Sequence, residues 1–256
     1  MRLGFSVGIF GAIAAFAGAS RAGTVVGKLE LPAPPERGPV IAKGFLDRTE
    51  NPLADIKKVN IAPYFVVALE GEAKSDTAPA EVSWELVGES FARPVIAVPV
   101  GAQVVIKNTT KIARTIGARE DPTLLTGPLN PTNTKSFRAT QPAIYTIGDA
   151  GAPHLRGKIV VVATPHVASL DDSGRFEMAD VPEGNYKLRV FYYDPAGEAH
   201  GGTSVWLPFS TDVMVASKAK ASKTEVNAKL SAVDLSSGPA SGLAPGPSSG
   251  PAPGKQ

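Results

Sequence analysis

The sequence predicts an all-β protein made of antiparallel β-sandwiches. Two observations lead to this fold class. Residues 91–162 contain short β-branched runs separated by turn residues and a Pro-rich segment, which is the pattern of consecutive strands. Residues 186–192 alternate apolar and cationic side chains with the period of two that places neighbours on opposite faces of a sheet.

Taken in chain order, the predicted strands begin with the alternating residues 24–31, which a Pro-rich, extended connector at 32–39 follows. The other strands are expected at residues 40–46, 64–70, 91–100, 104–108, 143–147, 157–162, 167–170, 175–179, 186–192, 203–209, 213–216 and 224–230. Asp171-Asp-Ser-Gly174 supplies a hairpin turn. It lacks the alternating oxygen ligands and the distant Glu of a calcium loop, so we interpret it as a turn.

Both ends of the chain differ in composition from this strand-rich part. Residues 1–22 combine an early Arg2, an apolar run and a final group of small residues, which predicts a secretory signal cleaved before Gly23. The apolar run is shorter than the roughly 20 residues of a membrane span, so no span is expected after cleavage. Residues 236–256 form a tail of Pro, Gly, Ser and Ala that is expected to be disordered. The predicted location is therefore periplasmic or secreted.

The charge balance disfavours nucleic acid as a partner. The chain has 26 basic and 24 acidic residues, a net charge of +2. Loss of Arg2 and Arg21 with the leader leaves 24 of each sign, so the mature chain carries no excess charge with which to attract a polyanion or an anionic membrane. The chain also contains no Cys, so its stability must come from apolar cores rather than disulfides.

The central strands carry a recognisable motif. Phe91, Pro94, Gly101, Val104 and Asn108 fit the pattern F-x-P followed by V, G-x-x-V and a final N. This pattern resembles the cupredoxins associated with bacterial methylamine utilisation, where it precedes an N-x-D-x-x-x-H loop. The second ligand loop of that family, roughly C-D-I-H-P-W-M-R-G-x-I-V-V, aligns without a gap with residues 149–161. The resemblance implies a cupredoxin-like Greek-key sandwich over residues 77–162.

The resemblance ends at the copper ligands. Asp149 stands at the position of the family's Cys, Ala152 at that of its second His and Leu155 at that of its Met. In the first loop Thr110 replaces the Asp, and Ala113 is assigned to the His position. A type 1 copper site needs two imidazoles and a thiolate, and this chain has no Cys. The sequence therefore predicts neither a copper site nor another cofactor.

A second motif lies outside the central unit. Residues 171–188 follow the pattern D-x-x-G-R-F-x-x-x-x-V-P-x-G-x-Y-x-L, which resembles the transthyretin-like, carboxypeptidase regulatory-like β-sandwich. The opening V-x-G of that fold corresponds to Val25-Val-Gly27. This resemblance implies that residues 23–76 and 163–235 form one sandwich from both ends of the chain, with the cupredoxin-like unit inserted in it or fused to its edge.

The candidate metal-binding side chains are few. The three histidines, His154, His166 and His200, lie far apart in the sequence, which disfavours a metal site. His154 lies in the segment aligned with the second ligand loop, where Asp149 is its only nearby candidate partner, and the two residues form a weak alternative metal site. Met178 follows strand alternation and is expected in a core; so is Met214. No metalloprotease, Walker, dinucleotide or nucleophile-elbow motif is present, so the chain is not expected to be an enzyme.

The preferred interpretation is an exported, metal-free binding or scaffold protein of the bacterial cell envelope that acts through contacts with an unknown protein partner. Partners of the metal-bearing relatives dock on the apolar surface around the ligand loops. The corresponding partner surface of this chain would include Leu124, Leu125, Leu129 and His154. Packing of this loop against the sandwich explains the same leucines.

Two alternatives stay open. The first is a periplasmic copper-binding or electron-transfer protein with a non-standard site that includes His154 and Asp149. The second is a carbohydrate-binding module, which requires an exposed aromatic platform. Its candidates are Trp84, Trp206 and Tyr193.

Overall fold

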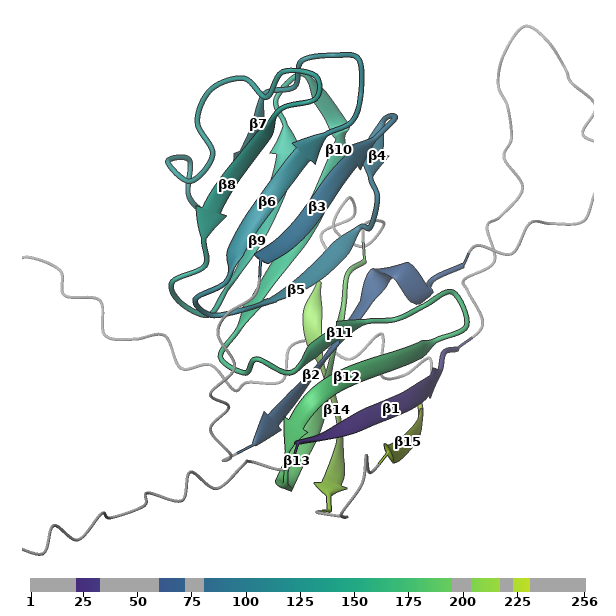
Figure 1. Ribbon diagram of the computed structural model, residues 1–256. Helices are drawn as coiled ribbons and strands as arrows, with labels where there is room; N and C mark the ends of the chain where they lie inside the picture. Colours follow the sequence, from purple (N-terminus) through teal and green to yellow (C-terminus); the bar gives the residue numbers. More distant parts are fainter. Residues whose placement is uncertain (1–21, 33–59, 72–80, 195–203, 217–222, 231–256) are drawn as a thin grey trace, which may run out of the picture.

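A computed structural model describes residues 22–32, 60–71, 81–194, 204–216 and 223–230 (Figure 1). Residues 1–21 of the predicted signal peptide, the predicted strand at 40–46, His200 and the C-terminal tail lie outside the described residues. Within the described ranges, no helix has the length and apolar character that crossing a membrane requires.

The described chain consists almost entirely of β-strands, which confirms the predicted all-β class. One short 3-10 helix, η1, covers Ala62–Tyr64. The strands are β1 (Ala22–Glu30), β2 (Phe65–Gly71), β3 (Glu81–Val87), β4 (Ser90–Phe91), β5 (Val95–Pro99), β6 (Gln103–Asn108), β7 (Ile116–Ala118), β8 (Thr134–Arg138), β9 (Ala143–Asp149), β10 (Ala152–Val162), β11 (Val167–Ser169), β12 (Arg175–Pro182), β13 (Gly184–Tyr192), β14 (Val205–Val215) and β15 (Lys223–Lys229).

Two sheets at the lower end of Figure 1 face each other, with strand orders β12-β1-β15 and β11-β2-β13-β14. We call this part the terminal sandwich, because its strands come from both ends of the described chain. Its core contains Val25, Phe65, Phe176, Tyr186 and Leu188 among other buried side chains. This arrangement agrees with a sandwich built from both chain ends, while its assignment as transthyretin-like stays a prediction.

The other two sheets have the orders β4-β3-β6-β8 and β5-β10-β9-β7 and form what we call the inserted sandwich. Its core includes Trp84, Ile106, Ile147, Leu155 and Ile159. Most neighbouring strands are antiparallel, but β3 pairs with β6 and β5 pairs with β10 in parallel. These parallel pairs arise because strands that follow each other in the sequence, such as β5 and β6, belong to opposite sheets.

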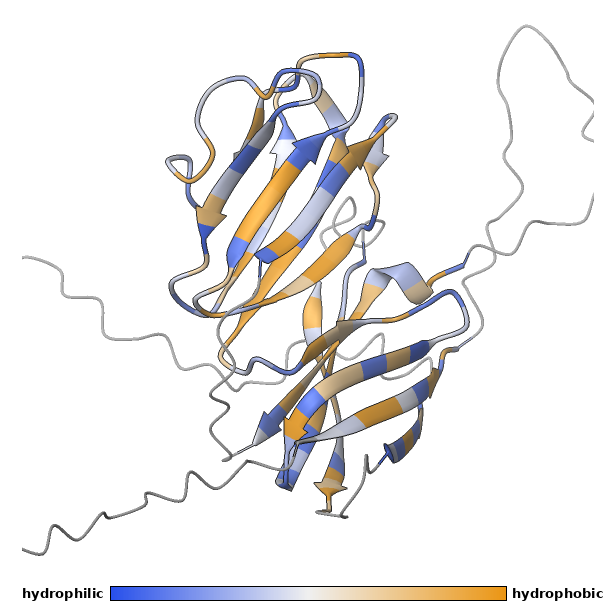
Figure 2. Ribbon diagram, in the orientation of Figure 1, coloured by the Kyte–Doolittle hydropathy of each residue, from blue (hydrophilic) through white to orange (hydrophobic). Residues whose placement is uncertain are grey.

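A third apolar cluster joins the two sandwiches. It consists of Val66, Ala68, Val95, Ala97, Val160, Val162, Phe191 and Tyr193. On the terminal side these residues come from β2, from β13 and from Tyr193, which follows β13. On the other side they come from β5 and β10, so the outer faces of two sheets pack together. Burial on both faces explains why β5, most of β2 and the end of β10 are continuous apolar runs, coloured orange in Figure 2, rather than alternating ones.

The residues of the second motif have clear packing roles. A Cβ atom on Gly27 would lie 2.3 Å from Cζ of Phe176, so the motif's first Gly makes room for its Phe. Gly174 adopts φ +79° in the turn before β12, a conformation that favours Gly. The Tyr186 hydroxyl donates to the Pro182 carbonyl oxygen at 2.8 Å. The motif therefore specifies close contacts within the terminal sandwich.

The structure also differs from the sequence prediction in several elements. Strands β3, β7 and β8 were not predicted, because they are short or mix polar residues into their alternation. The strands predicted at 203–209 and 213–216 are one strand, β14, which tolerates Pro208 because it lies at the sheet edge and carries a register shift there. On this strand Met214 is 71% exposed, so its assignment to the core was wrong, whereas Met178 is buried as predicted.

Candidate functional site

The candidate site lies at the end of the inserted sandwich that is farther from the terminal sandwich (Figure 1). We call it the loop end. It comprises the β3–β4 hairpin, the β6–β7 connection, the β9–β10 turn and the start of β10. The cupredoxin resemblance would place the copper ligands in the β6–β7 connection, the β9–β10 turn and the start of β10, and the β3–β4 hairpin lies beside them.

Asn108 fixes the conformation of the β6–β7 connection. Its side chain is fully buried, and Nδ2 donates to the carbonyl oxygens of Ile112 and Leu129, both at 2.9 Å. Its Oδ1 accepts from the backbone N and from Oγ1 of Thr110, at 2.9 and 2.7 Å. The amide has thus engaged both donors and its acceptor. Asn108 therefore acts as a loop-fixing residue.

The next functional position is Arg114. Counted from Asn108, the histidine of N-x-D-x-x-x-H falls on Arg114, so the assignment of Ala113 to this position was wrong by one residue. The backbone of Arg114 pairs with Leu129 in both directions, with N to O distances of 3.0 and 2.7 Å. This pairing, with the Asn108 bond to Leu129, holds the segment before β8 against the β6–β7 connection.

The Arg114 side chain connects two carboxylates. Nη1 lies 3.7 Å from Oδ2 of Asp149, and the two side chains are only 8% and 5% exposed. Nη2 donates to Oε1 of the exposed Glu89 at 2.9 Å. The other oxygen of Glu89, Oε2, lies 3.3 Å from Nε2 of His154. The pKa of Glu89 is lowered from its usual 4.5, mainly by the hydrogen bond from Arg114 and then by the one to His154.

Asp149 is also held by its own turn, since Oδ1 accepts from the backbone N of Gly151 at 2.8 Å. Asp149 and His154 therefore face different partners, Arg114 and Glu89 respectively. Within the described residues there is no group of three or more His, Cys, Asp and Glu side chains that could hold a metal ion. The alternative site of His154 and Asp149 gains no third ligand.

The residues at the loop end do not fit a type 1 copper centre. The four ligand positions of the resemblance hold Arg114, Asp149, Ala152 and Leu155. A guanidinium is permanently protonated and has no lone pair for a metal, and the side chains of Ala and Leu have no donor atom. Asp149 is engaged in an ion pair. The chain has no Cys to supply the thiolate, and none of these four positions carries an imidazole.

The second described histidine, His166, belongs to the terminal sandwich. It is buried, its ring lies edge-on to that of Tyr186 at 6.1 Å, and its Nε2 has no hydrogen-bond partner. Burial lowers its pKa below the usual 6.5, and the negative charge of Asp180 opposes part of this shift. His166 is therefore a packed neutral side chain, and it does not join His154 in a cluster.

The structure divides the residues predicted to form a partner surface. Leu125 and Leu129 are buried in the core of the inserted sandwich, and Leu124 is half-buried against it. Only His154 is well exposed. The leucines are buried because the hydrogen bonds from Asn108 and Arg114 hold this segment against the sandwich. Leu125 and Leu129 therefore cannot contribute to an exposed surface.

Two apolar residues that sequence reasoning missed are exposed at the loop end instead. Val87 is 49% and Ile112 56% exposed. Their segments lie together, because Thr109 N donates to the Leu86 carbonyl oxygen at 3.2 Å and Arg114 reaches Glu89. Gly88, with φ +60°, signalled a tight hairpin that presents Val87 at its start. We call Val87, Ile112 and His154 the rim.

The aromatic candidates for a carbohydrate platform are not available as one. Trp84 is buried, stacks on Phe91 with ring centroids 3.8 Å apart and donates from Nε1 to the Arg93 carbonyl oxygen. Tyr193 is buried between the two sandwiches.

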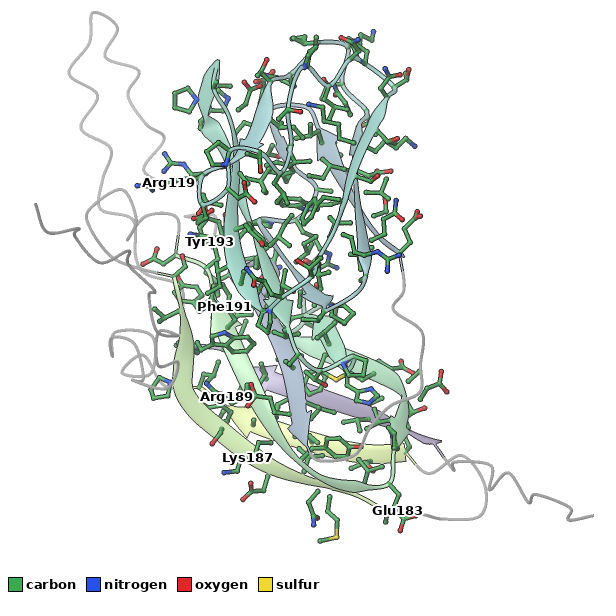
Figure 3. All side chains as sticks on the ribbon, turned by 90° about the vertical axis from the view of Figure 1, so that its left-hand side faces the viewer. Arg119, Glu183, Lys187, Arg189, Phe191 and Tyr193 are labelled. Carbon is green, nitrogen blue, oxygen red and sulfur yellow. The ribbon has the colours of Figure 1, made fainter. Side chains whose placement is uncertain are left out.

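The remaining candidate, Trp206, is half-buried and is covered by its neighbours. Phe191 lies edge-on to it at 5.6 Å, and the guanidinium of Arg189 lies 5.6 Å from its ring centroid. Figure 3 shows how Arg189, Phe191 and Tyr193 follow one another along this side of the molecule. These contacts count against a carbohydrate-binding module.

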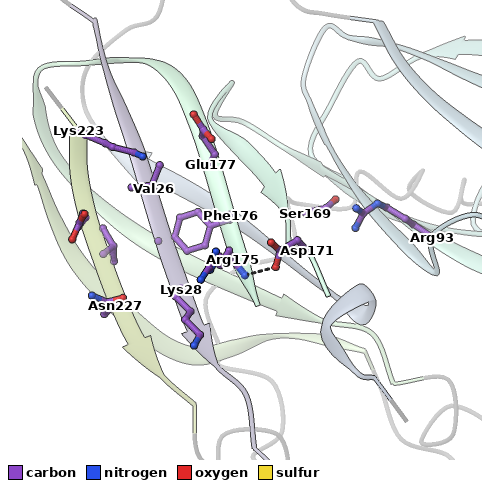
Figure 4. Close-up of a pocket in the computed structure, with 13 residues that line it drawn as sticks. Val26, Lys28, Arg93, Ser169, Asp171, Arg175, Phe176, Glu177, Lys223 and Asn227 are labelled. Atoms are coloured by element: carbon purple, nitrogen blue, oxygen red, sulfur yellow. Dashed lines mark hydrogen bonds between the residues drawn. The ribbon is translucent and has the colours of Figure 1, made fainter. Parts of the chain in front are cut away.

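A shallow groove of about 710 Å³ lies on the outer face of sheet β12-β1-β15 (Figure 4). In the sheet register, Lys28 lies directly opposite Arg175 on one side and Asn227 on the other. Two residues before Lys28, Val26 lies between Glu177 and Glu225 in the same way. The Asp171 carboxylate at its edge accepts hydrogen bonds from its own turn and from the Arg175 backbone. Rows of alternating charge are typical of a solvated sheet face, and no catalytic arrangement results.

Comparisons with known proteins gave structural matches alone. No protein-family model and no curated protein sequence matches the chain. A mutant of amicyanin has 18% sequence identity and a TM-score of 0.29, over 38% of this chain and 98% of amicyanin. A purple cupredoxin from Nitrosopumilus maritimus has 16% identity and a TM-score of 0.27, over 32% of this chain and 99% of that protein. A copper-containing nitrite reductase from Thermus scotoductus SA-01 has 21% identity and a TM-score of 0.31, over 36% of this chain and 25% of that enzyme.

Proposed function

We propose that this chain is a metal-free, non-enzymatic binding or scaffold protein of the bacterial cell envelope, exported by its N-terminal signal, that acts through contacts with another protein. The observation that carries this proposal is the ion pair between Arg114 and Asp149. It occupies two of the positions at which the cupredoxin resemblance would place ligands, and both side chains are buried. A protein that uses a metal at this end would not fill the place with a permanent cation.

The rim supplies a contact surface for the partner. Val87 and Ile112 are two of the three large hydrophobic side chains that are exposed in the described part of the chain. Exposed apolar side chains on two segments that are joined by a hydrogen bond favour an interaction site over a solvated loop. His154 is oriented by Glu89, which lies in the same hairpin as Val87. The partner is therefore a protein with an apolar contact surface, and no nucleic acid or membrane lipid is proposed.

Metal analysis of the natural protein tests the metal-free part of the proposal. The exported chain, purified from a periplasm, is analysed for bound elements and then titrated with Cu(II) and Zn(II) by calorimetry. We expect no stoichiometric metal and no binding tighter than the micromolar range. One tight equivalent of either metal would overturn the proposal and favour a non-standard site.

Site-specific crosslinking tests the protein contact. A photoreactive amino acid is placed at Ile112 on the rim, and in a matched variant at Glu225 on the exposed face of β15. In envelope preparations we expect a discrete crosslinked protein from position 112 and none from position 225. Equal crosslinking from both positions, or none from position 112, would contradict a contact through the rim.

A further inference from the structure

We infer that the Arg114 guanidinium takes the place of a metal ion as the cation that joins the segments of the loop end. A bound metal fixes several loops relative to one another because each contributes a ligand to one charge. At this end a side chain of the protein provides that charge. The loop end is thus assembled by folding alone, without metal loading. This inference concerns the assembly of the site and does not depend on the identity of a partner.

From the β6–β7 connection, Arg114 reaches two other segments of the loop end directly and the start of β10 through Glu89. Its backbone is paired with Leu129 before β8. Its side chain binds Glu89 in the β3–β4 hairpin through Nη2 and approaches Asp149 at the end of β9 through Nη1. Glu89 extends the connection to His154 in β10. The guanidinium therefore links the β3–β4 hairpin and the end of β9 to the β6–β7 connection.

Burial makes this link obligatory. Arg114 cannot lose its proton at physiological pH, and a buried charge is tolerated only when it is paired. Asp149 is equally buried and depends on the same contact and on the Gly151 backbone. If one member of the pair is removed, the other is left as an uncompensated buried charge. That charge can be solvated only if the surrounding segments open toward water.

The same guanidinium excludes a metal cation from this position. A divalent ion bound to Asp149 would lie within a few ångströms of Arg114, where like charges repel strongly in a partly buried site. Restoring metal-ligating side chains around it is therefore not sufficient while Arg114 is present. Removal of the arginine is the necessary step.

Hydrogen exchange tests whether Arg114 joins the loops. In Arg114→Met, we expect the amides of residues 88–90, 109–113 and 149–151 to exchange at least tenfold faster, while those of β13 are unchanged. The matched control is Lys107→Met, which removes the exposed ion pair with Glu85. If Arg114→Met does not fold, Arg114→Lys replaces it, because lysine keeps the charge but cannot reach both carboxylates with a planar fork. Unchanged exchange at the loop end in the folded variant would overturn the inference.

Copper titration tests the exclusion of metal. Two variants are compared: Asp149→Cys with Ala152→His, which retains the arginine, and the same pair with Arg114→Leu, so that both carry the same new ligands and differ only in the cation. We expect the triple variant to bind one equivalent of Cu(II) with a thiolate-to-copper absorption band, and the double variant to bind at least 100-fold more weakly. Equal binding by both, or by neither, would show that the arginine is not what closes the site. Metal analysis of the unaltered protein tests the proposed function separately. A protein without bound metal supports the proposed function whether or not Arg114 is the reason.

Discussion

The Nζ atom of Lys158, on β10 of the inserted sandwich, lies 5.9 Å from the centre of the Tyr193 ring, which belongs to the terminal sandwich. Both side chains are buried, and Nζ also donates to Oγ1 of Thr146 at 2.9 Å. Nearby, Nη1 of Arg93 donates to the Leu170 carbonyl oxygen, again from one sandwich to the other. Together with the apolar cluster between the sheets, these contacts make the two sandwiches one packed body.

The first prediction is that both sandwiches unfold in one transition. Trp84 lies in the core of the inserted sandwich and Trp206 on the terminal one, so Trp84→Phe and Trp206→Phe leave one fluorescent reporter in each. Each substitution changes the free energy of unfolding by itself. After correction for that change, urea unfolding should give the same midpoint through either tryptophan. Phe191→Ala removes a side chain from the cluster between the sandwiches and should cost about 3–5 kcal/mol. Two separate unfolding transitions in the variants that retain Phe191 would contradict the prediction.

The second prediction concerns the amide of Asn108. Asn108→Ala leaves the Ile112 and Leu129 carbonyl oxygens and the Thr110 amide without their present partner. Each buried polar group left unpaired costs about 1–3 kcal/mol. We expect a clear fall in Tm, followed through Trp84. Asn130→Ala serves as the control, because this side chain is exposed and should change Tm little. Similar Tm values for the two variants would argue against the role of Asn108.

The third prediction is a loss of stability in mild acid that depends on His166. Burial places its pKa in the folded protein below the 6.5 of the unfolded chain, so the unfolded state binds more protons between these two values. The free energy of unfolding should therefore fall as the pH drops below about 6.5. His166→Phe should flatten this dependence between pH 7.5 and 5.5, as measured by urea unfolding.

His154→Gln is the matched control for that measurement, since the His154 side chain is mostly exposed. It should retain the slope of the unaltered protein. Glu89, Asp121 and Asp171 also have lowered pKa values, and their contributions are lost only at lower pH. An unchanged slope in His166→Phe would count against the assignment.

The fourth prediction compares two glycines. A Cβ atom on Gly27 would lie 2.3 Å from the Phe176 ring and 2.6 Å from the Val226 carbonyl oxygen, whereas one on Gly117 would meet nothing within 4 Å. Gly27→Ala should destabilise the protein by about 1–3 kcal/mol through overpacking. Gly117→Ala should be close to neutral. Thermal unfolding of both variants gives the comparison, and equal effects would disagree with the packing around Phe176.

The sequence alone determined those features that depend on local pattern or on composition. The alternation of residues 186–192 placed Tyr186 and Leu188 in a core and Lys187 on the opposite face, as the structure confirms. The absence of Cys excluded a type 1 copper site, because no folding can supply a missing thiolate. These conclusions hold because a strand has a fixed period and a metal has fixed ligand requirements.

The tertiary structure decided what depends on contacts between distant segments. The approach of Arg114 to Asp149 joins residues 35 positions apart, and an error of one position in the motif had concealed it. The burial of Leu125 and Leu129, and the exposure of Val87 and Ile112, depend on how loops pack rather than on hydrophobicity. Likewise, continuous apolar runs in β2, β5 and β10 indicated strands, but only the packing of two sheets revealed the buried boundary between sandwiches.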